Sequence, residues 1–391
     1  MDEPKRKVAK FATNFLDYSQ TFIYDEIRFH RRYEVEVFCH RRMNEATFPC
    51  DRVHALAPAE TLGQSLEGLL YQATTLSPTV YRALKAGNFD VIHAHFGPGG
   101  IYALPYRKAL GTPLVVSFHG YDVPLLLSSR RFHPQWLRYF LLSPWMLKSV
   151  DRFLPSSMEL KRLLIQLGAP AHKVKLHHVG VEIPAKRPRL RNRVGEVNIY
   201  MIGRFIEKTG MEYGLEAFAR VLSQGAPVRM RIIGGGENKE LYQGIVRRHD
   251  MMGRVEFLGD LEHTVIMREL ANCDILLTPS VVAANGDREG QPAILKEANA
   301  RCIPAVGTIH SGIPELIEDG VTGLLVSEKD VDTMAQKLMV LVDNPELRRT
   351  MGLAAREKMV REQDVERRVE ALEQHLDEVV EQWRRNHPRQ P

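Results

Sequence analysis

Two glutamates, Glu289 and Glu297, stand eight residues apart in the stretch REGQPAILKE, around a Gly-Gln-Pro that resembles the start of a helix. Such a pair could be an acid/base couple, a metal site, two surface charges or two acceptors for one extended ligand. If every step between them were helical, they would lie about 12 Å apart along the axis and about 80° around it. Glycosidase carboxylates act about 5–10 Å apart across one bond, so a shared acid/base role is disfavoured. We interpret them as acceptors for separate hydroxyl groups, with the free N–H groups of the helix start between them attracting phosphate.

The stretch IGRFIEKTG, 202–210, offers a second anion site. A strand is expected to end at Gly203, and Arg204 and Lys208 follow in one loop before a helix. A guanidinium fork and an ammonium beside a helix start suit phosphate, although a solvated loop with Glu207 paired to one cation is the simpler alternative. Hydroxyl acceptors and a phosphate site together favour a sugar nucleotide as ligand.

Three glycines in RIIGGGENKE, among them Gly234, follow an apolar strand and let the backbone approach a neighbour closely. The pattern is neither GxGxxG nor a P-loop, so a tight strand–helix turn explains it equally well.

Histidines end two strands of the first half. His119 closes VSFHGYDVP, followed by Asp122, and His93 and His95 share one face of the strand in HAHFGPGG. Each could be a structural histidine or face a ligand. A metal site needs a third ligand, usually a carboxylate or thiolate. The sequence places none convincingly, so we expect no metal.

Short apolar runs alternate with amphipathic helical stretches along the whole chain, including VEVF, DVIHAHF and PLVVSF in the first half and VNIYMIG, MRIIGGG and DILLTPS in the second. This alternation predicts an α/β protein with parallel sheets covered by helices on both faces, and ligands bind such sheets at the carboxyl ends of the strands. A Pro-containing, strongly basic stretch separates two series, and the C-terminal helical run has no following strand, so its last helix must pack on a domain already built. The expected division is residues 1–182, a linker at 183–196, residues 197–364, and a helix at 365–391 that packs back on the first domain.

Composition sets the broad class. The 391 residues are 44% hydrophobic and 26% charged, with a net charge of +5. No apolar run is long enough to span a bilayer, the N-terminus lacks a signal-peptide core, and the four cysteines include no CxxC, so we expect free thiols and a cytoplasmic protein. The basic clusters could be solvated surface, a site for an anionic acceptor or a contact with anionic membrane; nucleic acid is disfavoured because no recognition motif accompanies the charge.

With these motifs in place, the chain resembles the family 4 retaining glycosyltransferases of GT-B fold. The family pattern E-G-x-P-x-x-x-x-E-A appears here from Glu289 to Ala298, and GRFIEKTG, IIGGGEN and HSGIPELIEDGVTGLLV extend it. In the first half, YSQTFIYDEI, VIHAHFGPGG and FHGYDV are similar to colanic acid and amylovoran-type exopolysaccharide transferases. The resemblance implies two doubly wound Rossmann-like domains that face a cleft.

The resemblance also implies residue roles. Glu289 would contact hydroxyls of the donor sugar, Glu297 the ribose, Arg204 and Lys208 the diphosphate, and His119 the reacting centre. The implied catalytic residues are thus His119, Arg204, Lys208 and Glu289. The implied donor-binding set is Gly203, Arg204, Lys208, Gly234, Glu289, Gly290, Gln291, Pro292, Ala293 and Glu297. On the acceptor side we expect Ser19, Gln20, His95 and Asp122.

Three departures from the family pattern stand out. Thr209 occupies the place of the lysine that usually precedes the glycine of the 202–210 loop, with Lys208 one residue earlier. The glycine loop near the N-terminus of many members is replaced by NFLDYS, 14–19. Cys302 stands where a glycine is common, and we expect it to serve packing.

The resemblance predicts transfer of a hexosyl unit from a nucleotide sugar, for which UDP-hexose is the first expectation, to a sugar, lipid-linked or small-molecule hydroxyl acceptor with retention. The alternatives are a soluble small acceptor, an epimerase on the same fold or a non-catalytic member. No metal is expected, because Asp330 or Asp332 of the DVD stretch precedes a helix as a cap does. No cofactor is expected either, since the nucleotide sugar is a substrate.

The segment 123–154 sets Trp136, Tyr139, Phe140 and Trp145 among the cations Arg130, Arg131, Arg138 and Lys148. Such a mixture suits the surface of an anionic membrane, which would make the protein peripheral to the inner face of the membrane. The alternative is an ordinary buried helical pair.

Overall fold

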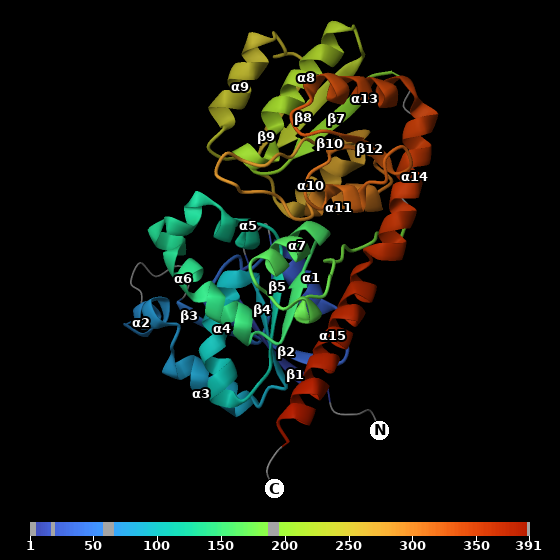
Figure 1. Ribbon diagram of the computed structural model, residues 1–391. Helices are drawn as coiled ribbons and strands as arrows, with labels where there is room; N and C mark the ends of the chain where they lie inside the picture. Colours follow the sequence, from blue (N-terminus) through green and yellow to red (C-terminus); the bar gives the residue numbers. More distant parts are fainter. Residues whose placement is uncertain (1–4, 17–19, 58–65, 187–194, 389–391) are drawn as a thin grey trace. The chain divides into compact units, whose positions relative to one another are not determined.

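The computed structural model describes residues 5–16, 20–57, 66–186 and 195–388. The chain divides into two compact units, Met1–Gly180 with Val365–Pro391, and Val181–Asp364 (Figure 1). Ser19, the expected glycine-loop replacement beyond Leu16, and most of the basic linker lie outside the described residues. None of the helices in the described part of the chain combines the length and apolar character needed to cross a membrane.

The first unit contains a six-stranded parallel sheet in the order β3-β2-β1-β4-β5-β6. This is the strand order of a doubly wound fold, in which the order reverses between β1 and β4. Both β4 and β5 are buried along their whole length, as expected for central parallel strands. The strands are β1 (Arg6–Phe15), β2 (Tyr33–Arg42), β3 (Val53–Ala57), β4 (Val91–His95), β5 (Leu114–Phe118) and β6 (Arg152–Pro155).

Helices cover both faces of this sheet. Ser77 and Ser157 begin two of them by accepting a backbone N–H bond with their side chains, as N-cap residues do. The helices are α1 (Thr21–Arg28), α2 (Leu66–Thr74), α3 (Pro78–Gly87), α4 (Phe96–Leu110), α5 (Asp122–Leu127), α6 (Pro134–Ser149) and α7 (Met158–Gln166), with 3₁₀ turns η2 (Ser129–Phe132) and η3 (Ala171–Lys173).

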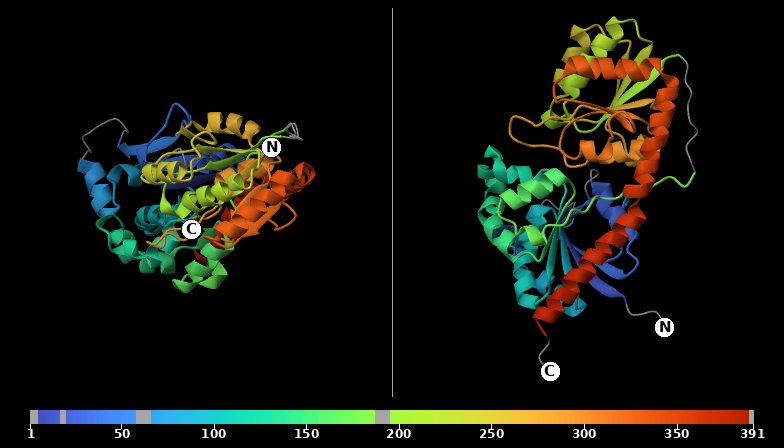
Figure 2. Two further views of the ribbon diagram at one scale, coloured as in Figure 1. Left: turned by 90° about the horizontal axis from the view of Figure 1, so that it is seen from above. Right: turned by 45° about the vertical axis from the view of Figure 1, so that its right-hand side comes forward.

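The last helix, α15 (Val365–Asn386), returns to this unit and crosses one face of its sheet (Figure 2). Its apolar stripe, including Leu372 and Leu376, packs on the β1, β4 and β5 face. Glu373, almost fully buried, accepts hydrogen bonds from the N–H groups of Arg31 and Arg32 at 2.8 Å. The predicted crossing of the C-terminal helix is therefore confirmed, and a buried carboxylate anchors it.

The second unit repeats the same strand order as β9-β8-β7-β10-β11-β12, again all parallel. Its reversal point lies between β7 and β10. The strands are β7 (Val197–Ile202), β8 (Val228–Ile233), β9 (Val255–Gly259), β10 (Ile275–Thr278), β11 (Ala305–Thr308) and β12 (Gly323–Val326). The helices are α8 (Met211–Ser223), α9 (Lys239–Arg248), α10 (His263–Glu269), α11 (Ala293–Ala300), α12 (Ile313–Leu316), α13 (Val331–Asp343) and α14 (Pro345–Glu362), with 3₁₀ turns η4 (Glu207–Thr209) and η5 (Leu270–Asn272).

Two sequence expectations in this unit concern helix ends. Asp330 caps α13 by accepting the Thr333 N–H at 3.0 Å, so the predicted capping role in the DVD stretch is confirmed. Cys302 is buried just beyond α11 with φ +61°, the left-handed conformation that favours glycine at this position. This backbone angle explains why glycine suits the site.

The predicted pair of doubly wound domains is confirmed. The strands that the sequence analysis did not list, β1, β3, β6, β9, β11 and β12, complete the two sheets. All four cysteines, Cys39, Cys50, Cys273 and Cys302, are free thiols as expected.

Candidate functional site

The carboxyl end of β7 carries the predicted anion loop, at the reversal point of the second sheet where doubly wound folds bind ligands. Arg204 is exposed, and its guanidinium has no hydrogen bond or ion pair with any residue that the structure describes. Lys208 lies in η4 and is only 4% exposed. Thr209, in the place of the family lysine, donates its hydroxyl to the carbonyls of Arg204 and Ile206 and so closes the loop on itself.

The Lys208 ammonium reaches across to the loop that follows β10. Its Nζ lies 3.5 Å from Asp287 Oδ1 and 3.5 Å from Glu289 Oε1, and 3.4 Å from the carbonyl oxygen of Arg288. The backbone joins the same two loops, because Val281 N–H donates to the Lys208 carbonyl at 2.9 Å. The structure thus brings together two predicted residues, Lys208 and Glu289, and gives the lysine two carboxylates to neutralise.

Gly234 follows β8 and adopts φ +136° against the β7 loop. A Cβ atom at this position would stand 1.9 Å from the carbonyl oxygen of Gly203, so any side chain would collide with backbone. The glycine stretch is therefore the tight turn that the sequence left as an alternative. It packs against the chain's own Gly203–Phe205 segment and supports the loop that bears Arg204.

Helix α11 begins at Ala293, and Pro292 (φ −59°, ψ 121°) stands immediately before it as the N-cap residue. Gly290 is held by its carbonyl, which accepts the Gly312 N–H at 3.0 Å, and a Cβ at Gly312 would lie 2.6 Å from that oxygen. Gln291 donates to Glu315 at 3.3 Å. The residues 290–293, predicted to bind phosphate, therefore lie at a helix start that hydrogen bonds to Gly312 and Glu315 hold in place.

Glu297 lies about one turn after the first residue of α11 and is 9% exposed. Its Oε1 is 2.7 Å from Nε2 of His263, the first residue of α10. The neighbouring Lys296 is buried, which lowers its pKa to about 8 against the raising effect of Glu297. One carboxylate oxygen of Glu297, the residue predicted to bind the ribose, is thus already in contact with His263.

In the first unit, His95 ends β4 and His119 follows β5. His95 Nδ1 lies 3.1 Å from His119 Nε2, and the two rings are stacked. Phe22 and Phe96 pack against the His119 ring at centroid distances of 4.7 and 4.9 Å. The imidazole is therefore held on several sides at the carboxyl edge of the sheet.

Asp122, expected on the acceptor side, is completely buried. Its two carboxylate oxygens accept the N–H groups of Gly97 and Gly120 at 3.0 and 3.2 Å. Burial raises the pKa of Asp122 to about 6, with those backbone bonds opposing the shift. Asp122 therefore stabilises the turn that follows His119. Gln20, another residue expected on the acceptor side, is half-buried immediately before α1.

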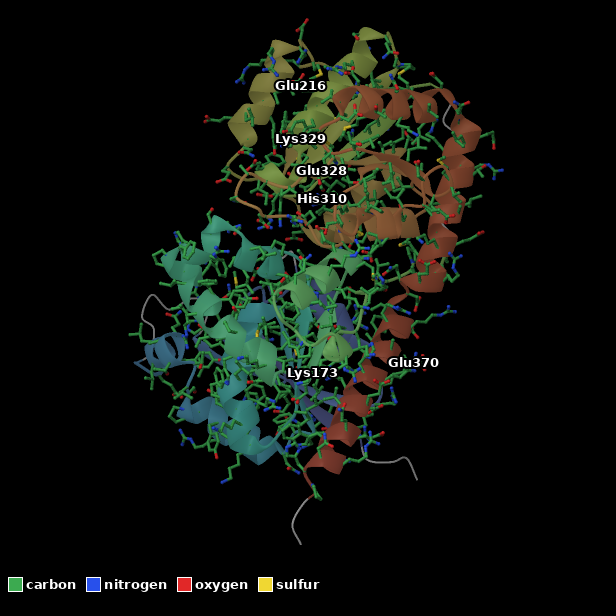
Figure 3. The ribbon with its side chains drawn as sticks, in the orientation of Figure 1. Lys173, Glu216, His310, Glu328, Lys329 and Glu370 are labelled. Carbon is green, nitrogen blue, oxygen red and sulfur yellow. The ribbon has the colours of Figure 1, made fainter. Side chains whose placement is uncertain are left out.

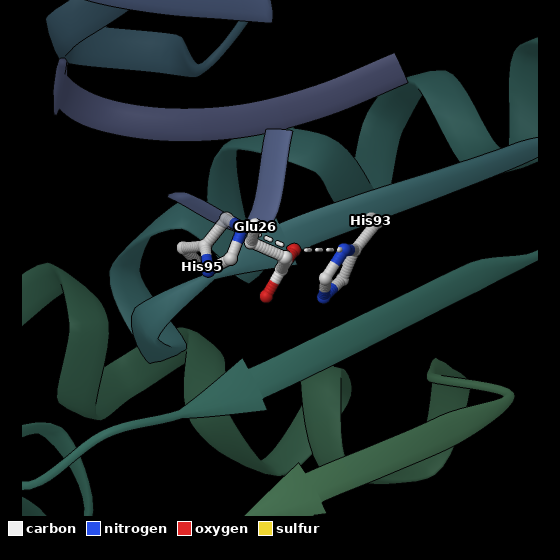
Figure 4. A group of neighbouring side chains, drawn as sticks. All are labelled: Glu26, His93 and His95. Atoms are coloured by element: carbon white, nitrogen blue, oxygen red, sulfur yellow. Dashed lines mark ion pairs between the residues drawn. The ribbon is translucent and has the colours of Figure 1, made fainter. Parts of the chain in front are cut away.

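A buried polar cluster lies behind His95 (Figure 4). Glu26 places Oε1 3.6 Å from His93 Nδ1 and 3.5 Å from His95 Nε2, so the third ligand that the sequence did not reveal comes from α1. Lys10 donates to the same Glu26 oxygen and lies 3.4 Å from His93 Nδ1. The ammonium thus already supplies the positive charge that this carboxylate requires.

The charges in this cluster follow from burial and pairing. Burial alone would raise the pKa of Glu26, but Lys10, with His95 and His93, holds it well below its usual value. Burial lowers the pKa of both His93 and His95. The Glu26 carboxylate is thus stabilised first by the Lys10 ammonium, and His93 also lies 2.8 Å from Ser117 Oγ.

The sequence analysis did not single out Glu26, Asp287, His263, His310 or Glu328. Glu26 contacts His95, His263 contacts Glu297 and His310 contacts the backbone N–H of Glu289, whereas Glu328 contacts His310. His310 lies in the HSGIPE stretch, directly after β11, and the strand-end rule that selected His119 would also have selected it. The same rule would have selected Glu328, two residues after β12, whereas no comparable signal marks Glu26, His263 or Asp287.

Family models match both units. Residues 26–183 match the family Glycosyltransferase Family 4, and residues 182–358 match Glycosyl transferases group 1. Together the two matches contain every predicted site residue except Ser19 and Gln20.

Curated relatives agree with these families. The candidate colanic acid biosynthesis glycosyltransferase WcaL of Escherichia coli K12 is 32% identical over 64% of this chain and 60% of its own length. The amylovoran biosynthesis glycosyltransferase AmsK of Erwinia amylovora is 33% identical over 69% of this chain and 65% of its own. The matched region therefore spans less than two thirds of either relative.

Among solved structures, Anabaena Alr3699/HepE in complex with UDP superimposes with a TM-score of 0.73 over 96% of this chain and 100% of its own, at 20% identity. At that identity the likeness concerns the fold. Taken with the two family matches and the two doubly wound sheets, it places the chain in the GT-B glycosyltransferases, with a Family 4 domain followed by a group 1 domain.

Proposed function

We propose that the chain is a retaining glycosyltransferase that moves a hexosyl unit from a nucleotide sugar, with UDP-hexose as the first choice, to a hydroxyl acceptor in exopolysaccharide synthesis. The observation that carries the proposal is the junction of the β7 and β10 loops, where Lys208 contacts Glu289 and an exposed Arg204 stands on the same loop as the lysine. The named roles of WcaL and AmsK support the pathway, and the UDP complex of HepE supports the nucleotide.

Charge development explains the residue types. Breaking a glycosyl–phosphate bond leaves positive charge on the sugar and negative charge on the diphosphate. Lys208 is buried and committed to Asp287 and Glu289, so in this mechanism Arg204 and the N–H groups of the 290–293 turn receive the diphosphate charge. Lys208 instead keeps the Glu289 carboxylate in place for the donor sugar.

Retention needs no enzymic nucleophile in this scheme. The acceptor hydroxyl attacks the anomeric carbon on the face from which the phosphate leaves, the anomeric C–O bond to phosphate breaks, and the departing phosphate oxygen takes the hydroxyl proton. His119, braced by His95, is the residue that we assign to the reacting centre from the first unit. No metal and no cofactor take part.

The test combines binding and turnover. UDP, GDP and ADP are compared by thermal shift, and the sugar donors of the stabilising nucleotide are then assayed for transfer and for hydrolysis. Glu289→Ala is expected to remove most turnover and to leave nucleotide binding nearly unchanged, because its partner is the sugar. The exposed Glu240→Ala on α9 is the matched control.

Three results would contradict the proposal. A Glu289→Ala enzyme that keeps half of its kcat would remove the assignment to the donor sugar. Donor turnover to an isomeric nucleotide sugar without acceptor would indicate an epimerase. A product whose anomeric configuration is opposite to that of the donor, measured by NMR couplings, would exclude retention.

We also propose that the first unit contacts anionic membrane through the outer surface of α5, η2 and α6. Large apolar side chains are exposed there: Leu127, Phe132, Leu137, Leu141 and Trp145. On α6, residues 137, 141 and 145 recur every four positions and form one stripe, and Lys148 lies one turn further along. Arg131 stacks over Phe132 and Phe140, which adds a cation to the apolar surface.

The structure corrects part of the predicted set of membrane-facing aromatic side chains. Tyr139 is buried, and its hydroxyl donates to the Asp122 carbonyl at 3.1 Å, so it belongs to the core. Trp136 is half-buried against Tyr121. The exposed stripe, rather than these two rings, therefore carries the membrane proposal.

Vesicle sedimentation tests this contact. Salt-sensitive binding to anionic vesicles, and weak binding to neutral vesicles, is expected. Binding should fall on Leu141→Ser and on Arg130→Glu with Arg131→Glu, whereas Leu241→Ser on the second unit, also exposed, is the control. A protein that stays in the supernatant under every condition would favour a soluble acceptor.

A further inference from the structure

His310 connects the Glu289 loop, which follows β10, to the end of the neighbouring strand β11. Its side chain is 1% exposed, its Nε2 accepts the backbone N–H of Glu289 at 3.2 Å, and its Nδ1 lies 2.7 Å from Glu328 Oε1. His310 follows β11 and Glu328 follows β12, neighbouring strands in one sheet. Figure 3 labels the two residues next to each other in the second unit.

Glu328 holds the other end of the same loop. Its second oxygen, Oε2, accepts the backbone N–H of Val282 at 2.9 Å. One histidine–glutamate pair therefore fixes both the first and the last amide of the segment 282–289. Inside the segment, Ala284 N–H donates to Glu207 Oε1 of the β7 loop at 2.8 Å, and Ala283 N–H donates to the Asp287 carbonyl at 2.9 Å.

The hydrogen bonds determine where the proton of His310 lies. A backbone N–H can only donate, so Nε2 must offer its lone pair to Glu289. The proton of the neutral ring is then on Nδ1, from which it is donated to the Glu328 carboxylate. The Glu289 N–H donates to Nε2, the Nδ1–H of His310 donates, and the Glu328 carboxylate accepts. The other neutral tautomer of His310 would leave both contacts without a proper donor–acceptor pair.

We propose that His310 and Glu328 are positioning residues that hold the Glu289 loop in its reactive conformation. This inference rests on the proposed function, in which Glu289 contacts the donor sugar. The Glu289 backbone is held at its N–H by His310 while its carboxylate is held by Lys208 3.5 Å away. With backbone and side chain both restrained, the carboxylate keeps its position without help from the ligand.

The principal variants are His310→Leu, which removes the acceptor, and His310→Gln, whose amide oxygen reaches a similar distance and can accept the Glu289 N–H. A misplaced catalytic group can cost about 100-fold in rate, so we expect His310→Leu to lower kcat by about 10- to 100-fold. Donor KM should change less than kcat, because the loop is reordered rather than removed. His310→Gln should recover a large part of kcat.

A more exposed histidine–glutamate pair provides the control. His249 Nε2 lies 2.8 Å from Glu216 Oε2, the same type of contact between α9 and α8. His249→Leu removes a histidine–glutamate pair of the same unit without touching the loop. It should leave kcat and loop exchange at wild-type values.

Amide hydrogen exchange of the 281–291 segment gives a readout that needs no substrate. His310→Leu should accelerate exchange of the backbone amide protons of Glu289 and Val282. Glu328→Gln should accelerate exchange at Val282, since the glutamine side chain has one carbonyl oxygen in place of the two carboxylate oxygens that face His310 and Val282. If His310→Leu does not fold, His310→Gln and Glu328→Gln carry the same comparison.

The outcomes separate this inference from the proposed function. Wild-type exchange in His310→Leu and Glu328→Gln, or a kcat loss no larger than that of His249→Leu, would overturn the positioning role. Faster exchange with full retention of kcat would overturn it as well. If Glu289→Ala keeps its turnover while loop exchange still depends on His310, the function proposal fails and only the structural restraint stands.

Discussion

Replacing Lys208 by methionine separates charge compensation from ligand binding. Methionine keeps most of the aliphatic stem but leaves Asp287 and Glu289 without their shared cation. The lysine is 4% exposed, so water cannot replace the ammonium without a rearrangement of the loop. We therefore expect Lys208→Met to destabilise the second unit as well as lower kcat.

The expected size follows from the geometry. At 3.5 Å and an effective dielectric constant of about 20, each lysine–carboxylate contact is worth about 5 kcal/mol of Coulomb energy. Desolvation of the ammonium offsets much of this, and removal of one member of a buried pair usually costs about 3–5 kcal/mol. The Asp287 and Glu289 side chains retain 14% and 25% exposure, which reduces the expected loss to about 2–3 kcal/mol.

Calorimetry and urea unfolding measure this loss. For a unit of this size, about 2–3 kcal/mol corresponds to a fall in melting temperature of about 4–12 °C. Arg204→Met is the control, since that exposed side chain has no partner among the described residues and should lower activity with little change in stability. A Lys208→Met protein within 0.5 kcal/mol (roughly the error of such a comparison) of the wild type would refute the reasoning, as would equal destabilisation by Arg204→Met.

Three further predictions concern other parts of the molecule. Glu297→Ala should weaken nucleotide affinity by about 1–3 kcal/mol, and His263→Ala by a smaller amount, because the histidine only holds the carboxylate; unchanged affinity by titration calorimetry would remove the ribose role. Burial opposes the shift, but hydrogen bonds from His30 and two backbone amides lower the pKa of Glu373 from 4.5 to about 2. The ionised Glu373 carboxylate therefore stabilises the fold above its unfolded pKa of 4.5, and this stabilisation is lost as the pH falls towards about 2. Glu373→Gln should cost about 3 kcal/mol of unfolding free energy at pH 7 and progressively less below pH 4.5. A pH-independent difference in urea midpoints would contradict this. Transferase activity should survive EDTA, whereas full loss restored by Mn²⁺ or Mg²⁺ would show that a metal is required.

The sequence was sufficient for the fold class because its signals are local. Buried parallel strands are continuous apolar runs, and the residues directly after them, such as Arg204 and His119, must lie at the carboxyl edge of a sheet. The same reasoning identified the Asp330 cap and the free cysteines. These features depend on neighbours within a few positions, so periodicity and spacing reveal them.

The partners of those residues depend on contacts between distant segments, and spacing carries no information about them. The sequence presented Lys208 as a phosphate ligand, but only the fold shows that it lies buried between Asp287 and Glu289. Likewise it offered His93 and His95 without a third group. The Glu26 carboxylate comes from the first helix, and the buried Lys10 determines its charge.

The amino-acid sequence by itself determined the alternation of strands and helices, the ends of the most apolar strands and the charged side chains available there, but not the strands β1, β3 and β12. Tertiary structure alone decided how those side chains are held: Glu373 joins a helix to a turn more than three hundred residues earlier, and His310 and Glu328 close both ends of the Glu289 loop. The physical reason is that strand and helix formation follow from backbone geometry and local burial. Hydrogen bonds that cross between strand ends exist only once the sheet has set their register.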